Sequence, residues 1–399
     1  MTHLVLMKTY FLLFYKSHMT KILSLVFLFF LNSVNFSYSS FVDTEAETAV
    51  VIDADTGQIL FEKNKNIKTY PASMTKIMTV LIIFEKLKNG TLQLDDKFTV
   101  SEKAWKEREG SSMFVEVGKE IRVEDLLRGI IVQSGNDACI VVAEEIAGSE
   151  EAFAIIMNDQ ANKIGLQNTN FTNSTGFFDE DNYSTVYDIA LLSQYLINNF
   201  PEYYHLFAET EFEWSGIKQS NRNPLLFKEM GADGLKTGYL SASGYALAAS
   251  AIQGNRRLIS VANGFSSVKT RSQGSSRLLT WAFREYTNIN LGKSDEVYSE
   301  IEIPHAKKMV QVKPSKDIII TVSKAKKDQI KQSIIVKPDT AAPIKADSTV
   351  ASLEITIGEN ERVYFDLKTV NDVEKKGIFG SFFSYISNLF TSLFSIIFS

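Results

Sequence analysis

Cysteine, histidine and excess positive charge are all scarce in this sequence, and each shortage excludes a class of protein. The single cysteine, Cys139, cannot form a disulfide within the chain. The four histidines show no metal-ligand spacing, so we expect neither a metal centre nor another cofactor. A formal net charge of -5 gives no electrostatic footprint for nucleic acid, and we expect no such partner.

The first residues have the pattern of an export signal. From Met19 the chain runs MTKILSLVFLFFLNSVNFSYSS, with a basic start, an apolar core and small residues placed for cleavage. We therefore predict a signal region over residues 1–39, translation starting at Met19, and a mature chain that begins near Ser40. An uncleaved membrane anchor is the alternative for this segment.

Residues 40–292 have the pattern of one layered domain of helices and strands. At 399 residues and 45% hydrophobic composition, the chain can bury a large core. The run TAVVIDADTGQILFEKN indicates a β-hairpin, and helical patterns follow to about Met230. Three strand-like runs come next, DGLKTGYL, SGYALAASAIQG and NRRLISVANG, and the amphipathic run SSRLLTWAFREYTN closes them. We predict an α+β (α/β layered) fold whose antiparallel sheet pairs its first and last strands across a helical insertion.

Two smaller parts follow this domain. Residues 293–374 contain short alternating strands between turns rich in proline and charge, which predicts a small all-β domain. Residues 375–399 are uncharged from Gly377 onward, with polar residues at helical spacing and a broad apolar face. We expect an amphipathic helix that lies in a membrane surface, with Lys375 and Lys376 among the headgroups. A membrane span and a buried helix are the alternatives.

The stretch PASMTKIMTVLIIFEKLKNG carries the first indication of chemistry. Proline suits the first helical turn and Gly90 supplies a stop, so a helix is predicted from about Ala72 to about Lys88. Its middle is apolar on nearly every side, which places it inside the domain. Lys76 would then be half-buried with no acid within one turn, and it could draw the proton from a nucleophilic Ser73. The alternative is that Ser73 caps the helix and Lys76 reaches solvent.

Two further motifs decide between these interpretations. The run VQSGNDA supplies Ser134, Gly135 and Asn136, and DGLKTGYL supplies Lys236 and Thr237 followed by a glycine. SxxK, SGN and KTG therefore occur in this order along the chain, at plausible separations. Together they form the motif set of penicillin-binding proteins and serine β-lactamases.

Further stretches narrow the resemblance to one family. GSSMF at residues 110–114, LLRGIIVQSGNDA, NRNPLLF, SGYALAASA and RRLISV resemble the D-alanyl-D-alanine carboxypeptidases, the low-molecular-mass penicillin-binding proteins of bacteria. The similarity covers roughly residues 45–290, and the all-β part and the C-terminal helix resemble the family in layout. The resemblance implies an exported, periplasmic enzyme that removes the terminal D-alanine from the stem pentapeptide of peptidoglycan. It also implies β-lactam antibiotics as covalent inhibitors.

The resemblance assigns catalytic roles to residues of the first two motifs. Ser73 is the implied nucleophile, and Lys76 is the base that takes its proton. Ser134 is expected to relay a proton to the leaving D-alanine, and Asn136 is expected to hold the acyl chain through its amide. The alternative for Asn136 is that it only caps a helix.

The third motif is expected to supply the binding wall of the site. Lys236 would set the local positive potential, Thr237 would help bind the carboxylate, and Gly238 would let the substrate lie close to the strand. The backbone N–H groups of Ser73 and Tyr239 would form the oxyanion hole. The alternative for Thr237 is an ordinary strand residue.

Two arginines and one tyrosine complete the set that the resemblance implies. Arg271, in VKTR, matches the family arginine that meets the terminal carboxylate, and Arg222, in NRNPLLF, is a further binding residue. The alternative for Arg271 is a solvated charge on a loop. Tyr239 departs from the best-known members, which have histidine after KTG, and this bears on the rate and pH profile of deacylation.

Three rival functions are compatible with parts of this pattern. A serine β-lactamase of the commonest class would need an ExxLN element, and no such string occurs between Asn136 and Lys236. A DD-endopeptidase that cleaves peptide cross-links has the same three motifs and remains an alternative. A non-catalytic wall-binding protein is the third, and the complete motifs argue against it.

Overall fold

The computed structural model describes residues 42–107 and 109–376. The expected signal region, 1–39, and most of the expected anchor, 375–399, lie outside these residues. Within the described part, no helix is both long enough and apolar enough to cross a membrane.

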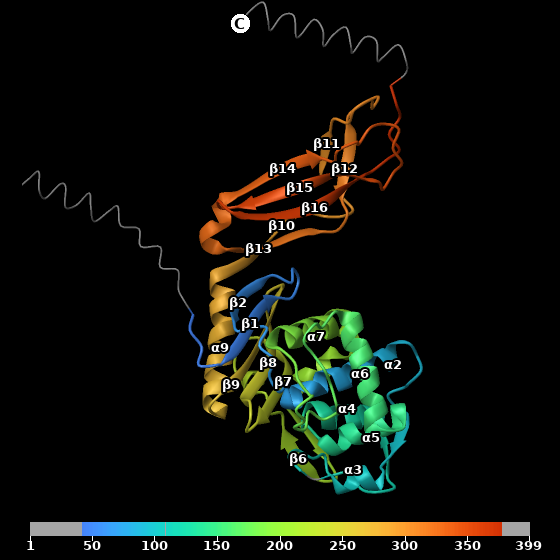
Figure 1. Ribbon diagram of the computed structural model, residues 1–399, viewed down its shortest axis with the longest axis vertical. Helices are drawn as coiled ribbons and strands as arrows, with labels where there is room; N and C mark the ends of the chain where they lie inside the picture. Colours follow the sequence, from blue (N-terminus) through green and yellow to red (C-terminus); the bar gives the residue numbers. More distant parts are fainter. Residues whose placement is uncertain (1–41, 108, 377–399) are drawn as a thin grey trace, which may run out of the picture. The chain divides into compact units, whose positions relative to one another are not determined.

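A five-stranded antiparallel sheet lies at the centre of the first domain (Figure 1). In sheet order its strands are β2 (Ile59–Lys63), β1 (Thr48–Asp53), β9 (Arg256–Phe265), β8 (Gly244–Gln253) and β7 (Ala232–Leu240). The hairpin expected around DTGQ is β1–β2, and the three later strand-like runs are β7, β8 and β9. Both predictions are confirmed.

Within this sheet, the first strand in the chain pairs with the last. β1 runs antiparallel to β9, with register pairs from Thr48 opposite Asn263 to Asp53 opposite Leu258. All of β1 is buried, because helices pack against it from both faces of the sheet. The predicted pairing across a helical insertion, and with it the layered α+β fold, is confirmed.

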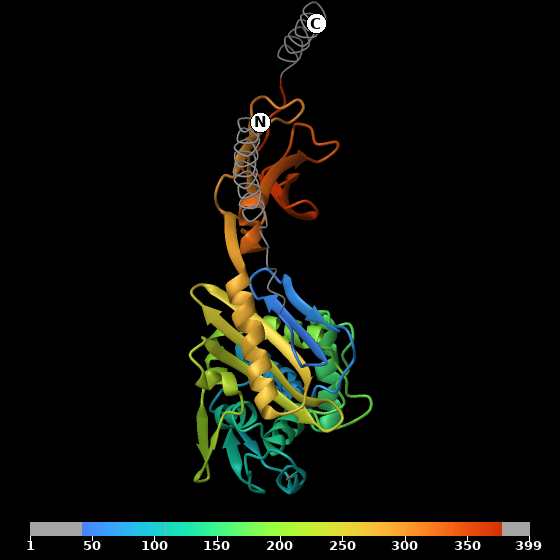
Figure 2. The ribbon, with the colours of Figure 1, turned by 90° about the vertical axis from the view of Figure 1, so that its left-hand side faces the viewer.

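Helices cover both faces of the sheet. α9 (Val268–Glu285) packs on β8 and β9, and the other helices lie on the opposite side, where α7 (Val186–Asn199) packs on β1 and β9 (Figures 1 and 2). These other helices are α2 (Lys76–Lys88), α3 (Glu102–Lys106), α4 (Val123–Ile131), α5 (Asn136–Ala147), α6 (Glu150–Ile164) and α8 (Pro201–Tyr204). The 3-10 turns are η1 (Ala72–Thr75), η2 (His205–Ala208) and η3 (Pro224–Phe227). Two small two-stranded sheets pair β3 (Lys97–Thr99) with β4 (Glu120–Arg122), and β5 (Glu211–Trp214) with β6 (Ile217–Ser220).

α2 is the buried helix that the sequence predicted. Every side chain from Ile77 to Phe84 is at most 1% exposed. The helix contacts α4, α6 and α7, so apolar residues on all its sides have partners. Since each buried aliphatic side chain contributes about 1.5–3 kcal/mol relative to exposure, α2 is a firmly held base for the residues at its N-terminal end.

The second domain is built of strands, as predicted. One sheet has the order β11 (Ser299–Ile301), β12 (Val310–Pro314), β16 (Glu361–Thr369), β15 (Thr349–Ile357) and β14 (Ile330–Val336). A second pairs β10 (Tyr286–Gly292) with β13 (Ile318–Ser323), and the 3-10 turn η4 (Lys324–Gln329) leads into β14. β10 precedes the division expected between residues 292 and 293 and pairs with a strand that follows it. The apolar side chains of these strands form a core of their own.

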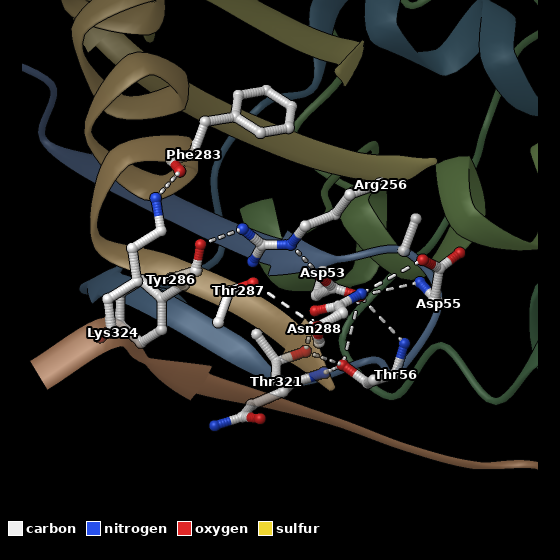
Figure 3. A network of polar contacts seen from close by, with 12 residues as sticks. Asp53, Asp55, Thr56, Arg256, Phe283, Tyr286, Thr287, Asn288, Thr321 and Lys324 are labelled. Carbon is white, nitrogen blue, oxygen red and sulfur yellow. Dashed lines mark hydrogen bonds and ion pairs between the residues drawn. The ribbon is translucent and has the colours of Figure 1, made fainter. Parts of the chain in front are cut away.

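A polar network centred on Asp53 ties β1 to β9, β10 and β13 (Figure 3). Asp53 is fully buried, and its Oδ2 accepts a hydrogen bond of 2.8 Å from Arg256 Nε. Its Oδ1 accepts from Thr56 N and from Asn288 Nδ2. Asn288 Oδ1 in turn accepts from Thr321 Oγ1 at 2.9 Å. The network satisfies a buried carboxylate, which would otherwise be costly, and it contains none of the expected site residues.

Candidate active site

Ser73 lies in η1, directly before α2. The predicted helix therefore starts as a 3-10 turn, and the regular α-helix begins only at Lys76. Ala72, next to Ser73, has a φ of +49°, in the left-handed region that a residue with a Cβ rarely adopts. Strained backbone of this kind persists only where surrounding contacts hold it, and here it presents the Ser73 hydroxyl at the end of the buried helix.

Lys76 is fully buried, at 1% exposed, and so does not reach solvent. Its Nζ contacts three oxygens, at 3.1 Å from Ser73 Oγ, 2.7 Å from Asn136 Oδ1 and 2.5 Å from Thr175 O. Desolvation lowers the pKa of this amine from 10.5 to about 8. The sequence interpretation of a half-buried lysine understated its burial, because a loop far along the chain covers it.

The three oxygens around Lys76 differ in whether they can also donate a hydrogen bond to the amine. A neutral amine keeps two N–H donors and one lone pair. Thr175 O can only accept, and Asn136 Oδ1 only accepts because its Nδ2 donates to Glu109 O at 2.8 Å. Ser73 Oγ is therefore the partner that can turn from acceptor to donor. The geometry directs the lone pair of Lys76 at the Ser73 hydroxyl proton, which is the arrangement a general base needs.

This geometry predicts how acylation depends on pH. We expect the rate constant for acylation of Ser73 by a penicillin to rise about tenfold per pH unit below the Lys76 pKa and to level off above about 8. The sign follows from the lowered pKa, because the amine loses its proton, and becomes a base, as pH rises through that value. Measuring the acylation rate between pH 6 and 9 tests it, and a flat profile over this range would contradict it.

The SGN motif forms the wall beside Lys76. Ser134 is 2% exposed with a φ of +61°, directly before α5. Gly135 is the N-cap of that helix and Asn136 is its first residue, so Asn136 is not the cap. Its side chain instead joins Lys76 Nζ to Glu109 O. The first two motifs therefore meet around one amine.

Asp137 is a residue of the site that sequence reasoning missed. Its buried carboxylate accepts hydrogen bonds from Ser112 Oγ at 2.7 Å, Met113 N at 2.8 Å and Val115 N at 3.1 Å. It thereby fixes the GSSMF segment against the start of α5. The sequence does show an aspartate directly after SGN. Its hydrogen-bond partners lie more than twenty residues earlier, however, and no local pattern indicates them.

The loop that covers Lys76 was also missed. Asn173 Oδ1 accepts from the backbone N–H groups of Thr175, Gly176 and Phe177, which folds the loop into a tight turn. Gly176 has a φ of +82°, and a Cβ there would lie 1.9 Å from Ala72 O. The loop can therefore pack on the nucleophile turn only with glycine at this position. An asparagine three residues before a glycine was the available signal.

The KTG strand forms the opposite wall. Lys236 and Thr237, on β7, are 3% and 5% exposed. Burial lowers the pKa of Lys236 well below its ordinary value, and the charges of Lys76 and Arg222 lower it further. A Cβ at Gly238 would lie 3.0 Å from Pro71 O. Glycine here lets β7 pack closely on the turn that carries the nucleophile.

Two arginines add positive charge to the same place. Arg271 lies in the first turn of α9 and is 6% exposed, so it is not a solvated charge on a loop. Desolvation lowers its pKa to about 10, so it stays charged at neutral pH. Arg222 is exposed, and its charge lowers the pKa values of Lys76, Lys236 and Arg271. The site is thus strongly cationic and suited to an anionic substrate.

The described residues contain no group of three or more histidine, cysteine, aspartate or glutamate side chains that could hold a metal ion. Cys139 is buried in α5, and burial raises the pKa of its thiol to about 12, so it stays protonated. The groups that form the site include the hydroxyls of Ser73 and Ser134, two buried amines and two guanidinium groups. This set can perform acyl transfer on a substrate that carries a carboxylate.

Comparisons with known proteins agree with this chemistry. Residues 35–266 match the family model described as D-alanyl-D-alanine carboxypeptidase, and residues 286–375 match the C-terminal domain of penicillin-binding protein 5. The chain is 35% identical to D-alanyl-D-alanine carboxypeptidase DacA of Haemophilus influenzae over 88% of this chain and 91% of that protein.

Solved structures show the same fold. Penicillin-binding protein 5 from Haemophilus influenzae superposes with a TM-score of 0.80 at 34% identity, over 84% of this chain and 99% of that one. Penicillin-binding protein D2 from Listeria monocytogenes, solved in an ampicillin-bound form, has a TM-score of 0.56 at 28% identity, over 61% and 99%. By sequence, fold and arrangement of the motifs, this chain belongs to the D-alanyl-D-alanine carboxypeptidase family of serine peptidases.

Proposed function

We propose that the protein removes the terminal D-alanine from the stem pentapeptides of peptidoglycan through an acyl-enzyme on Ser73. The observation that carries the proposal is the amine of Lys76, which is buried, has a lowered pKa and lies 3.1 Å from Ser73 Oγ. Membership of the carboxypeptidase family supports the choice of substrate.

The reaction follows from the geometry. Ser73 Oγ attacks the carbonyl carbon of the penultimate D-alanine while its proton passes to Lys76 Nζ. Backbone N–H groups of Ser73 and of Tyr239, on the edge strand β7, stabilise the oxyanion. The C–N bond then breaks as Ser134 gives its hydroxyl proton to the leaving amine and takes the proton held by Lys76 in its place, and water later hydrolyses the ester to regenerate Ser73.

The remaining residues bind and orient the peptide. Arg271 and Thr237 hold the terminal carboxylate, with Arg222 supplying further positive charge. Asn136 holds the acyl chain through its Nδ2, which exchanges Glu109 O for the substrate carbonyl. Lys236 keeps the potential positive around Ser134, and Gly238 keeps β7 close to the Ser73 turn.

One experiment separates this function from its rivals. The purified protein is incubated with a stem pentapeptide and, separately, with a cross-linked peptide dimer. The products are identified by mass spectrometry. Release of D-alanine from the pentapeptide supports the proposal. Cleavage of the dimer alone would favour a DD-endopeptidase. If neither substrate is hydrolysed, the proposed function is refuted.

β-Lactam antibiotics are the proposed covalent inhibitors. A β-lactam presents a strained amide and a carboxylate, which match the nucleophile and the cationic wall of this site. The ampicillin-bound form of the Listeria relative supports the proposal. The adduct would lie on Ser73.

We also propose that the enzyme works in the periplasm, on the outer face of the cytoplasmic membrane, after export by the signal region 1–39. The domains are proposed as 40–292 for catalysis, 293–374 for the all-β part and 375–399 for a membrane-surface helix. The peptidoglycan substrate of the family supports this location.

Deleting residues 377–399 is expected to release the protein from membranes with its activity on a small peptide unchanged. All the proposed catalytic residues precede residue 290, and the apolar face of the deleted segment would supply most of the binding. Membrane fractionation and peptide hydrolysis measure the two effects. Retention of the truncated protein in the membrane fraction would instead indicate an uncleaved N-terminal anchor.

A further inference from the structure

Arg271 is a buried cation that lacks a hydrogen-bonding anion. Its side chain is 6% exposed, and its Nε is buried without a hydrogen-bond partner in the described part of the chain. A buried N–H donor that is left without a partner is costly. We therefore expect the Arg271 guanidinium to bind a ligand that carries a carboxylate.

An aromatic ring contacts this guanidinium. The Arg271 Cζ lies 5.8 Å from the centroid of the Tyr245 ring, on β8. A cation–π contact holds the plane of the guanidinium without occupying its N–H groups. An aspartate in the same position would have paired with those groups and competed with the substrate.

A second tyrosine packs on the first. Tyr239 and Tyr245 are register partners on β7 and β8, so their side chains lie on the same face of the sheet. Their ring centroids are 4.3 Å apart, with 32° between the planes. Tyr239 is 53% exposed, whereas Arg271 is buried. The three side chains thus form a row that runs from solvent to the buried cation.

The row belongs to the site rather than to the core. Tyr239 directly follows the KTG motif on β7, and the charge of Arg271 lowers the pKa of Lys236 on the same strand. Tyr239 is exposed and Tyr245 is only half-buried, and neither belongs to the hydrophobic core of the domain. Its measurable effect should therefore be on how Arg271 meets its ligand.

We propose that Tyr245 is a positioning residue for Arg271, and that Tyr239 holds the Tyr245 ring in place by stacking on it. Together the two rings set the preference of the enzyme for substrates with a free terminal carboxylate. This inference rests on the proposed function, in which Arg271 binds that carboxylate.

The test compares two substrates that differ only at the carboxylate. One is an acyl-D-alanyl-D-alanine peptide, and the other is the same peptide with a C-terminal carboxamide. In Tyr245→Leu we expect KM for the free acid to rise roughly tenfold, as the loss of one desolvated cation–π contact implies, while KM for the amide and both kcat values stay within about twofold. In Tyr239→Leu, a residue whose backbone N–H is proposed for the oxyanion hole, only the ratio of KM for the free acid to KM for the amide is compared, and we expect this ratio to rise roughly threefold.

Conservative and distant variants serve as controls. Tyr245→Phe keeps the ring and should retain the wild-type KM within about twofold, and Tyr364→Leu, at a 55% exposed tyrosine on β16, should change nothing. An equal rise in KM for the acid and the amide would overturn the inference, as would a Tyr245→Phe variant as impaired as Tyr245→Leu. Thermal melting checks folding, and if Tyr245→Leu does not fold, the exposed Tyr239→Leu decides the matter.

Failure of this inference can be told from failure of the proposed function. If the wild type releases no D-alanine, the proposed function is wrong. The inference is then decided by acylation with benzylpenicillin and with its methyl ester. Their rate ratio should fall roughly tenfold in Tyr245→Leu, and an unchanged ratio overturns it.

Discussion

Replacing Lys76 with methionine is expected to lower the rate of Ser73 acylation by roughly 10²–10⁴-fold, the contribution typical of a positioned general base. Methionine has a similar length and suits a site that is 1% exposed, so the loss should come from the missing amine. The rate of adduct formation with a labelled penicillin, followed by mass spectrometry, measures the effect. In the wild type the label should lie on Ser73 alone.

The matched control is Lys88→Met, at the other end of α2. The Lys88 side chain is 52% exposed and pairs with Glu202 at 3.7 Å, so its loss should leave acylation unchanged. Acylation of Lys76→Met at the wild-type rate would refute the role of Lys76 as base. A label on Ser134 would refute Ser73 as the nucleophile.

Gly176→Ala is expected to damage stability and activity together. A Cβ at this position would lie 1.9 Å from Ala72 O, so the loop or the nucleophile turn must move. Steric overlap and a φ of +82° together should lower the free energy of unfolding by roughly 2–4 kcal/mol. Since Thr175 O is 2.5 Å from Lys76 Nζ, a displacement of about 1 Å should lower kcat/KM by roughly 10².

Gly148→Ala separates the effect of backbone strain from that of the clash. Gly148 has the same φ of +82°, but no atom lies within 4 Å of a Cβ placed there. We expect a loss of about 1 kcal/mol in unfolding free energy and no change in kcat/KM. Chemical denaturation and peptide hydrolysis measure both variants. Equal behaviour of the two would show that the contact with Ala72 has no part in catalysis.

The sequence predicted those features that depend on side-chain type or on local periodicity. A helix apolar on every side had to be buried, and alternating runs at both ends of the domain had to pair, as α2 and the β1–β9 ladder show. The three motifs were visible for the same reason, because the chemistry of Ser73, Lys76 and their partners needs particular side chains.

Features that depend on backbone groups from distant segments could not be read in this way. Thr175 contributes a carbonyl oxygen, which every residue possesses, so no residue type marks it. Asp137 acts on backbone N–H groups of the segment from residue 112 to residue 115, which reaches it only in the folded chain. The full burial of Lys76 has the same origin, since it depends on where the Asn173 turn packs.

The ladder between β1 and β9 has a consequence for the order of folding. Thr48 and Asn263 are partners about 215 residues apart in the chain, and the whole helical insertion lies between them. A growing chain therefore contains SxxK and SGN long before it can complete the sheet, and contacts this distant in sequence form slowly. The strand that carries KTG also arrives late, directly before β8 and β9. The nucleophile is thus made early in synthesis, but we expect it to remain unreactive until the chain through β9 is available to complete the sheet.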